Sequence, residues 1–281
     1  MASSETPVRI ALENSWETTC NIYRSGCDEN GECVAEYDPL EGILFAETGS
    51  KDLVGKSKFR NKRAVSMQTH SLTTQSTPPY MTTMEVAGTT ATIVALSMNP
   101  SGTDELTILN CGDSRTLVIG QPNSPINRGA ASVVVFETRD HSPDDEIEIQ
   151  RLEQGYAAGL DYSIPQCSPA GSYMVVGDYQ YALCRSLEGT FVTSKGIVSD
   201  PDVSTLDLAS SLADRRHCAV VLACDGLFEV MSNEEVGREV IRMRKEGYKA
   251  GDIAKNLCGQ ALKKGSYDNL SVIVVYLDHV L

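Results

Sequence analysis

From Gly88 onward, short β-rich runs follow one another along the chain without alternating strictly with helices. Turn sequences separate these runs, and two amphipathic helical patterns come only near the end, over about 232–245 and 250–264. Strict alternation of strands and helices would predict a parallel sheet, whereas strands joined by turns predict antiparallel pairing. The pattern therefore predicts an α+β fold in which helices cover antiparallel sheets.

Individual elements can be placed along this region. Strands are expected over 89–96, 106–119, 133–136, 173–176 and 191–193, the second run folded into a hairpin around Gly112 and Asp113. A helix is expected to begin after a Ser142 cap, with Pro143 in its first turn, and to end near Gly155. Residues 1–60 carry few sustained patterns and are interpreted as a divergent N-terminal segment that can pack on a domain over 61–281.

Composition narrows the class of protein. The chain has 281 residues, 41% of them hydrophobic, so it can bury a full core. Its net charge of −14 argues against nucleic-acid and anionic-membrane binding, which depend on clustered Lys and Arg. Its nine cysteines include no Cys-x-x-Cys pair, so neither a disulfide framework nor a zinc ribbon is predicted. Without a membrane-spanning run or a secretory signal pattern, the protein is expected to be intracellular and cytoplasmic.

Two carboxylates stand where strand-like runs end or begin. Asp225 follows Ala219–Cys224 and precedes Gly226, and Asp268 lies just before Leu270–Val275. Carboxylates held rigidly at strand ends suit hard cations such as Mg²⁺ or Mn²⁺, so both are candidate metal ligands. The alternative is that each accepts hydrogen bonds from turn amides, a frequent role of Asp at turns.

Six motifs give the chain a family resemblance. They are Gly88-Thr-Thr-Ala, Asn110-Cys-Gly-Asp-Ser-Arg115, Asp140-His-Ser-Pro143, Tyr181-Ala-Leu-Cys-Arg-Ser-Leu187, Leu222-Ala-Cys-Asp-Gly-Leu-Phe228 and Ser266-Tyr-Asp-Asn269. Their order resembles that in metal-dependent protein phosphatases of type 2C. The resemblance implies a sandwich of two antiparallel sheets flanked by helices. In active members it also implies a two-metal site that hydrolyses phosphoserine or phosphothreonine esters.

The sequence departs from this family where the bridging metal ligand belongs. The family's Asp-Gly-His-Gly-Gly stretch, whose Asp bridges the two ions, is absent. The opening Arg-x-x-Met-Glu-Asp element is matched by Arg63 to Met67 with one extra residue, but Gln68 and Thr69 replace its two acids. The 20 residues 68–87 then stand where the family fits a strand and two long helices, and eight of them are Ser or Thr. The helical pair is therefore predicted to be shortened or missing.

Other family positions are altered or open to two interpretations. Gly189 replaces a metal-binding Asp, and Glu188 lies one place early, so its side chain is expected to point elsewhere. Asp113 could match an acid of an accessory metal site, but we interpret it as capping its turn and pairing with Arg115. Arg63 is a candidate phosphate-binding residue by resemblance, with a surface arginine as the alternative.

The leading hypothesis is a pseudophosphatase, a catalytically impaired 2C-like protein that acts as a protein-binding, regulatory or structural module. It would hold at most one weakly bound Mg²⁺ or Mn²⁺ at Asp225 and Asp268, without a binuclear centre. A protein partner, such as a phosphoprotein, is expected, and either it or the N-terminal segment would cover the sheet face left by the missing helices. The rival hypothesis is a divergent active phosphatase that recruits Asp52, Glu85 or Glu188 as replacement ligands, or works with one ion held by Asp225 and Asp268. It requires at least three carboxylates within about 2.0 to 2.3 Å of a common Mg²⁺- or Mn²⁺-sized position.

Overall fold

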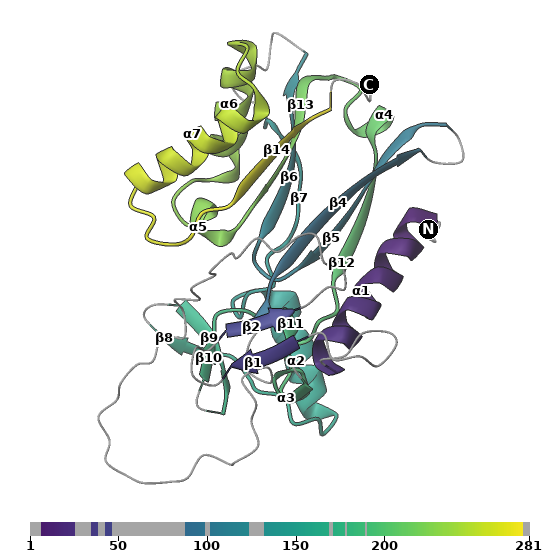
Figure 1. Cartoon of the computed structure of the whole chain (residues 1–281), viewed down its shortest axis with the longest axis vertical. Coiled ribbons are helices and arrows are strands. Elements are labelled where there is room, and N and C mark those ends of the chain that lie inside the picture. Colours follow the sequence, from purple (N-terminus) through teal and green to yellow (C-terminus); the bar gives the residue numbers. More distant parts are fainter. Residues whose placement is uncertain are drawn as a thin grey trace.

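The computed structural model describes residues 7–25, 35–38, 43–46, 88–98, 102–123, 132–168, 171–177, 179–188 and 190–277. Two antiparallel sheets form the centre of this part of the chain (Figure 1). One sheet has the strand order β14-β13-β6-β7, and the other has the order β12-β5-β4. Helices flank both sheets, so the structure has the predicted α+β architecture.

The two sheets share one apolar core. The four-stranded sheet contains β6 (Arg115–Pro122), β7 (Val134–Glu137), β13 (Arg215–Ala223) and β14 (Val272–Tyr276). The three-stranded sheet contains β4 (Ala91–Met98), β5 (Asp104–Cys111) and β12 (Asp202–Asp207). Side chains from both sheets lie in a common cluster, which includes Leu106, Ile108, Val118 and Val220.

The predicted hairpin over 106–119 is wrong, because its two halves belong to different sheets. β5 pairs with β4 and β12, whereas β6 pairs with β7 and β13. Gly112 lies at the crossing with a φ of 109°, a conformation that favours glycine. A Cβ on Gly112 would also lie 2.3 Å from Thr90 Cγ2. The turn residues therefore mark a passage of the chain from one sheet to the other.

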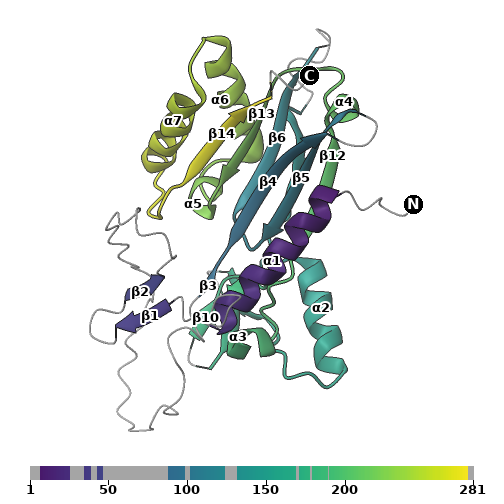
Figure 2. The same cartoon turned by 45° about the vertical axis from the view of Figure 1, so that its right-hand side comes forward.

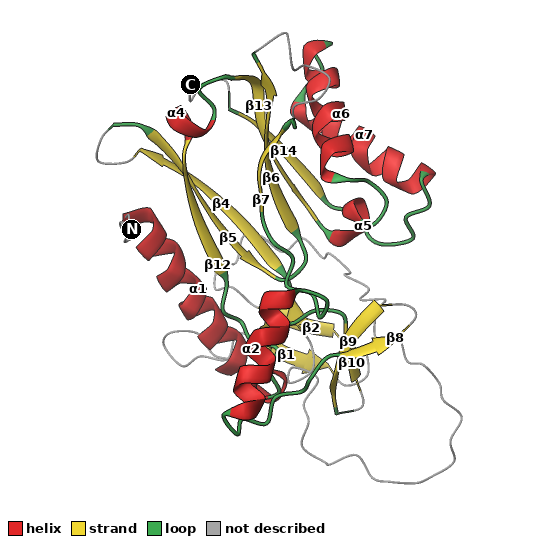
Figure 3. Ribbon diagram, turned by 180° about the vertical axis from the view of Figure 1, so that it is seen from behind, coloured by secondary structure: helices red, strands yellow, loops and turns green. Residues whose placement is uncertain are grey.

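Two helices near the end of the chain cover the outer face of the four-stranded sheet (Figure 3). They are α6 (Asn233–Lys245) and α7 (Ala250–Lys263), close to the predicted ranges. Ser232 and Glu235 form a capping box that satisfies amides of the first turn of α6. The helices share a buried core with the sheet, which includes Leu117, Val221, Val236, Val240, Ile253, Leu257 and Val274.

A smaller group of elements lies at one end of the two sheets (Figure 1). It includes α2 (Glu146–Ala157), β8 (Gln166–Ser168), β9 (Gly171–Val176), β10 (Tyr179–Tyr181) and α3 (Thr190–Ser194). Asp145 caps α2 in place of the predicted Ser142, because its carboxylate accepts the amides of Ile147 and Glu148. The strand expected over 191–193 is instead part of helix α3.

The remaining described elements are short. They are β1 (Ala35–Asp38), β2 (Ile43–Ala46), β3 (Gly88–Thr89), β11 (Leu187–Glu188), α4 (Leu208–Ser211) and α5 (Asp225–Phe228). β1 pairs with β2, and β11 pairs with β3, both antiparallel. Among the described helices, none is both long and apolar enough to cross a membrane.

Helix α1 (Pro7–Ser25) packs on the outer face of the three-stranded sheet (Figure 2). Its buried residues Trp16 and Cys20 are four apart, so they lie on one side of the helix. They pack with Leu109 and Leu187, and the Trp16 indole Nε1 donates to the Ser199 carbonyl at 2.6 Å. An N-terminal helix thus covers part of this sheet face.

Residues 47–87, including the region of the predicted missing helices, lie outside the described residues.

Replacing Cys20 with aspartate is expected to release α1 from the sheet, because Cys20 is only 5% exposed and its surroundings are apolar. Trp16 is the single tryptophan of the chain, so its fluorescence emission reports the contact directly. We expect a red shift in Cys20→Asp. Thr19→Asp, which places the same charge on the exposed side of α1, should keep the native emission. Identical spectra for the two variants would contradict the observed packing.

Candidate metal centre

Three carboxylates gather at one end of the four-stranded sheet. One oxygen each from Asp225, Glu229 and Asp268 lies within 4.8 Å of the others. Ligands on opposite sides of a Mg²⁺ ion are about 4 Å apart, since each bond is about 2.0–2.1 Å long. Small side-chain movements would therefore bring all three oxygens onto a single ion. The structure joins the two predicted metal ligands and adds a third carboxylate.

Two turns position these side chains. Asp225 is the first residue of α5 and follows β13 after the single residue Cys224, and Asp268 lies shortly before β14. Gly226 lets the turns approach closely, because a Cβ there would lie 2.7 Å from the Asn269 carbonyl oxygen. The Ser266 hydroxyl donates to the Gly226 carbonyl at 2.8 Å and joins the two turns.

The turn-amide interactions considered for both aspartates are present. Asp225 Oδ1 accepts the Gly226 amide at 2.8 Å, and Asp268 Oδ1 accepts the Asn269 amide at 2.6 Å. These bonds do not compete fully with cation binding, because an ionised carboxylate has two oxygens and about four lone-pair sites. Instead, these hydrogen bonds fix the orientation of each carboxylate, and a rigid metal site needs ligands that are fixed in this way.

Glu229 was missed in the sequence analysis. It directly follows α5 and lies one helical turn beyond Asp225. Residues four apart on a helix face the same side, so the spacing of Asp225 and Glu229 was the available signal. It was overlooked because a helix of only four residues, Asp225–Phe228, carries no recognisable periodic pattern.

The negative charges of this group act on Asp113. Burial raises the pKa of Asp113 to about 6, and the negative charges of Asp225, Asp140 and Asp268 act in the same direction. The predicted pairing of Asp113 with Arg115 is wrong. Arg115 instead donates to Asp140 at 2.9 and 2.5 Å. This end of the sheet therefore carries a concentrated negative potential that a cation would relieve.

Glu188 lies apart from the acidic group. Its side chain is buried against Gly88 of β3, and its Oε1 accepts a hydrogen bond from Ser186 at 2.5 Å. Burial raises the pKa of Glu188 to about 7, while the hydrogen bond from Ser186 lowers it. In contrast to Asp113, no charge of Asp225 or Asp268 contributes to this shift. The prediction that Glu188 points elsewhere agrees with this placement.

Arg63, Asp52 and Glu85 lie outside the described residues, so their roles stay predictions.

Two packed antiparallel sheets with carboxylates at the strand ends agree with the resemblance to metal-dependent phosphatases of type 2C. Residues 12–270 match the family model Protein phosphatase 2C, and the chain belongs to this family. The predicted family and fold class are thus confirmed. Members of this family are metal-dependent serine/threonine phosphatases that use Mg²⁺ or Mn²⁺.

Two relatives identified by sequence agree with this assignment. Protein phosphatase 1B of Mus musculus is 32% identical over 199 residues, covering 68% of this chain and 43% of the relative. Probable protein phosphatase 2C 69 of Arabidopsis thaliana is 33% identical over 172 residues, covering 61% and 40%. The chain thus spans about two fifths of the length of these relatives. A solved serine-threonine phosphatase 2C of Toxoplasma gondii aligns with a TM-score of 0.46 and 21% identity, over 61% of this chain and 54% of that chain.

Proposed function

We propose that this chain is a catalytically impaired member of the 2C family that binds one divalent cation and acts through a protein partner. The observation that carries the proposal is the composition of the acidic group. It contains Asp225, Glu229 and Asp268, whereas the chain has no Asp-Gly-His-Gly-Gly stretch to supply the bridging carboxylate. Two-metal hydrolysis depends on ions about 3.5–4 Å apart, which a shared ligand must hold together.

The residues present fit a single hard cation. Oxygen ligands from carboxylates are the donors that Mg²⁺ and Mn²⁺ prefer, and Asp225, Glu229 and Asp268 supply three of them. Burial raises the pKa of Asp113, and the negative charges of Asp225, Asp140 and Asp268 raise it further. The Arg115 guanidinium is paired with Asp140. A bound cation would supply positive charge that polarises a phosphoryl oxygen.

The second candidate function is a divergent active phosphatase. It requires at least three carboxylate oxygens within about 2.0 to 2.3 Å of a common ion position. Asp225, Glu229 and Asp268, whose oxygens lie within 4.8 Å of one another, are the candidates for this role. Such an enzyme would work with a single ion or complete its site with Asp52 or Glu85, both outside the described residues. The two candidates therefore differ in turnover, while both include cation binding.

Strand β4 supports the proposed protein partner. Among the described residues it pairs only with β5, and it exposes Ile93, Leu96 and Met98 at 37%, 51% and 71%. The strand sequence Ala-Thr-Ile-Val-Ala-Leu-Ser-Met contains no charge and no proline, the residues that usually protect an open sheet edge. An apolar edge of this kind is typical of an interaction surface.

Hydrolysis of a phosphothreonine peptide by the purified chain in Mg²⁺ or Mn²⁺ tests this proposal. We expect the wild-type protein and Asp225→Asn to show the same background rate, because cation binding alone does not assemble the two-metal clamp. Metal-dependent turnover that Asp225→Asn abolishes would support the divergent enzyme and overturn the impaired one. The matched variant excludes a contaminating phosphatase, whose rate would not respond to the substitution.

A further inference from the structure

Strand β13 has an irregular beginning at the end opposite Asp225. Its register with β6 shifts between Arg216 and Ala219, which defines a β-bulge. His217, inside the bulge, has a φ of 54°, a left-handed conformation that is strained for a residue with a side chain. Bulges re-aim side chains, so the direction of the His217 imidazole is set by an unusual and costly backbone.

The bulge brings His217 among cationic side chains from two elements. The Arg244 guanidinium donates to the carbonyl of Cys218, the residue after His217, so the last turn of α6 lies beside the bulge. Burial and the charges of Arg244, Lys245 and Arg216 lower the pKa of His217. Arg216 comes from β13, whereas Arg244 and Lys245 come from the last turn of α6. We call Arg216, His217, Arg244 and Lys245 the basic cluster.

Contacts with neighbouring residues fix the position of the Arg244 side chain within the basic cluster. Its guanidinium donates to the Cys218 carbonyl and lies over the Tyr276 ring, 4.4 Å from the centroid. The Leu277 amide donates to the same Cys218 carbonyl at 3.0 Å. The bulge, the helix and β14 therefore hold this part of the basic cluster together.

The charge of the cluster is not explained by the helix end alone. Cations in a last turn complement the helix dipole, which accounts for Arg244 and Lys245. Arg216 and His217 belong to a strand and gain nothing from that effect. Arg216 and Lys245 are exposed, and the described residues give neither of them an ion-pair partner. The neighbouring Glu246 is engaged by Arg242 at 2.7 Å.

We propose that the basic cluster binds a phosphate group carried on a phosphorylated peptide. A phosphorylated serine or threonine carries about −1.5 to −2 charges at pH 7 and three acceptor oxygens, which suits a compact group of arginine, lysine and histidine donors. A phosphopeptide fits better than an anionic membrane. The cluster is small, and the chain as a whole has a net charge of −14, whereas a bilayer surface requires a wider basic face.

The basic cluster is a separate site from the metal centre. Arg216 is the second residue of β13, a strand of nine residues with a rise of about 3.3 Å each. Asp225 begins α5, which lies beyond the other end of that strand (Figure 1). The inference does not rest on the proposed function. It is therefore tested with EDTA present, so that no cation at the carboxylates contributes to binding.

Binding is measured by fluorescence anisotropy with a labelled alanine-rich peptide that carries one phosphothreonine, and with its unphosphorylated form. We expect the phosphorylated peptide to bind at least about tenfold more tightly than the unphosphorylated form. Arg216→Glu and Lys245→Glu should each weaken binding of the phosphorylated peptide about tenfold. Lys255→Glu is the matched control, because Lys255 is exposed on the neighbouring helix α7 and should leave binding unchanged. Equal affinity for both peptides, or equal losses in all three variants, would overturn the inference.

Proton NMR of the imidazoles gives a second readout. The chain has four histidines, and His217→Gln identifies the relevant signal. Inorganic phosphate and the phosphopeptide should both raise the pKa of His217, since an added anion favours the imidazolium. Vesicles with about one third phosphatidylserine test whether the basic cluster binds an anionic membrane instead of a phosphopeptide. Binding to these vesicles without a response to the phosphopeptide would assign the surface to a membrane and contradict the proposal.

Discussion

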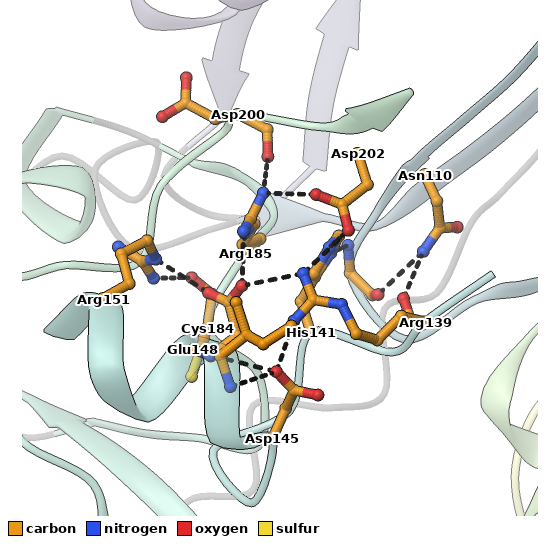
Figure 4. Close-up of polar contacts among 12 residues, drawn as sticks. Asn110, Arg139, His141, Asp145, Glu148, Arg151, Cys184, Arg185, Asp200 and Asp202 are labelled. Atoms are coloured by element: carbon orange, nitrogen blue, oxygen red, sulfur yellow. Dashed lines mark hydrogen bonds and ion pairs between the residues drawn. The ribbon is translucent and has the colours of Figure 1, made fainter. Parts of the chain in front are cut away.

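Replacing Glu148 with glutamine is expected to lower the free energy of unfolding by about 3–5 kcal/mol, the usual effect of removing one partner from a buried ion pair. The Glu148 side chain is fully buried. Its Oε1 accepts from Arg185 Nη2 at 2.5 Å and Nε at 2.8 Å, and its Oε2 accepts from Arg151 Nε at 2.9 Å (Figure 4). Glutamine keeps the shape of the side chain but removes the closer of the two carboxylate charges that face the buried Arg185 cation, the other being Asp202 at 3.1 Å.

The effect is large because Glu148 belongs to a network that joins the smaller elements to the sheets. Arg185 also donates to Asp202 of β12 at 3.1 Å and to the Asp200 carbonyl at 3.0 Å (Figure 4). Arg139 links the same Asp202, at 2.9 Å, to Asp145, the cap of α2. Loss of one carboxylate therefore weakens contacts between α2 and β12.

Urea unfolding of the wild type, Glu148→Gln and Glu153→Gln measures this effect. Glu153 is exposed on the same helix, so its substitution should change stability by less than about 0.5 kcal/mol. Burial raises the pKa of Glu148, but hydrogen bonds and charge from Arg185 and Arg151 outweigh it and lower the pKa overall. The stability from this group is thus present at neutral pH and is lost as the pH falls through its lowered pKa. Equal stabilities for both variants at pH 7 would contradict this account.

Asp225→Asn is expected to weaken Mn²⁺ binding at least about a hundredfold. Mutating residues that only hydrogen-bond to a metal ligand already lowers metal affinity by about 10- to 100-fold, and Asp225 is proposed to contact the ion itself. Asp225 shares the acidic group with Glu229, one helical turn away, and Asp268, on the adjacent turn. Asparagine retains one neutral oxygen and removes the charge that attracts the cation. Glu229→Gln should reduce affinity in the same direction.

Isothermal titration with Mn²⁺ measures these affinities. Asp252→Asn is the control, since Asp252 is an exposed acid in the first turn of α7 and its loss changes the net charge equally. Its affinity should match that of the wild type. If Asp252→Asn weakened binding as much as Asp225→Asn, the effect would come from overall charge, and the site assignment would be wrong.

The sequence predicted those parts of the fold that local patterns determine. Ser232 and the amphipathic runs placed α6 and α7 closely, because caps and helical periodicity act within a few residues. The passage of the chain at Gly112 between two sheets was missed, since turn residues do not specify which strands pair. Helix α1 was missed as well, although the spacing of Trp16 and Cys20 was available.

The candidate site was predicted in part for the same reason. Asp225 and Asp268 stood out because each marks the junction of a turn and an apolar strand. The proximity of Asp113 to this group depends on how α5 and the Gly112 turn approach in space. No local pattern encodes such distances. The pairing of Arg115 with Asp140 likewise joins residues 25 positions apart in the sequence, at the start of β6 and after the end of β7.

The number of Mn²⁺ ions bound per chain tests the central claim most directly. It is measured by equilibrium dialysis with metal analysis, together with electron paramagnetic resonance of the bound manganese. One ion per chain, with the spectrum of an isolated Mn²⁺ and lost in Asp268→Asn, is the predicted result. Two ions per chain with an exchange-coupled spectrum would show that a bridged pair assembles without the family's bridging aspartate, and would contradict the account.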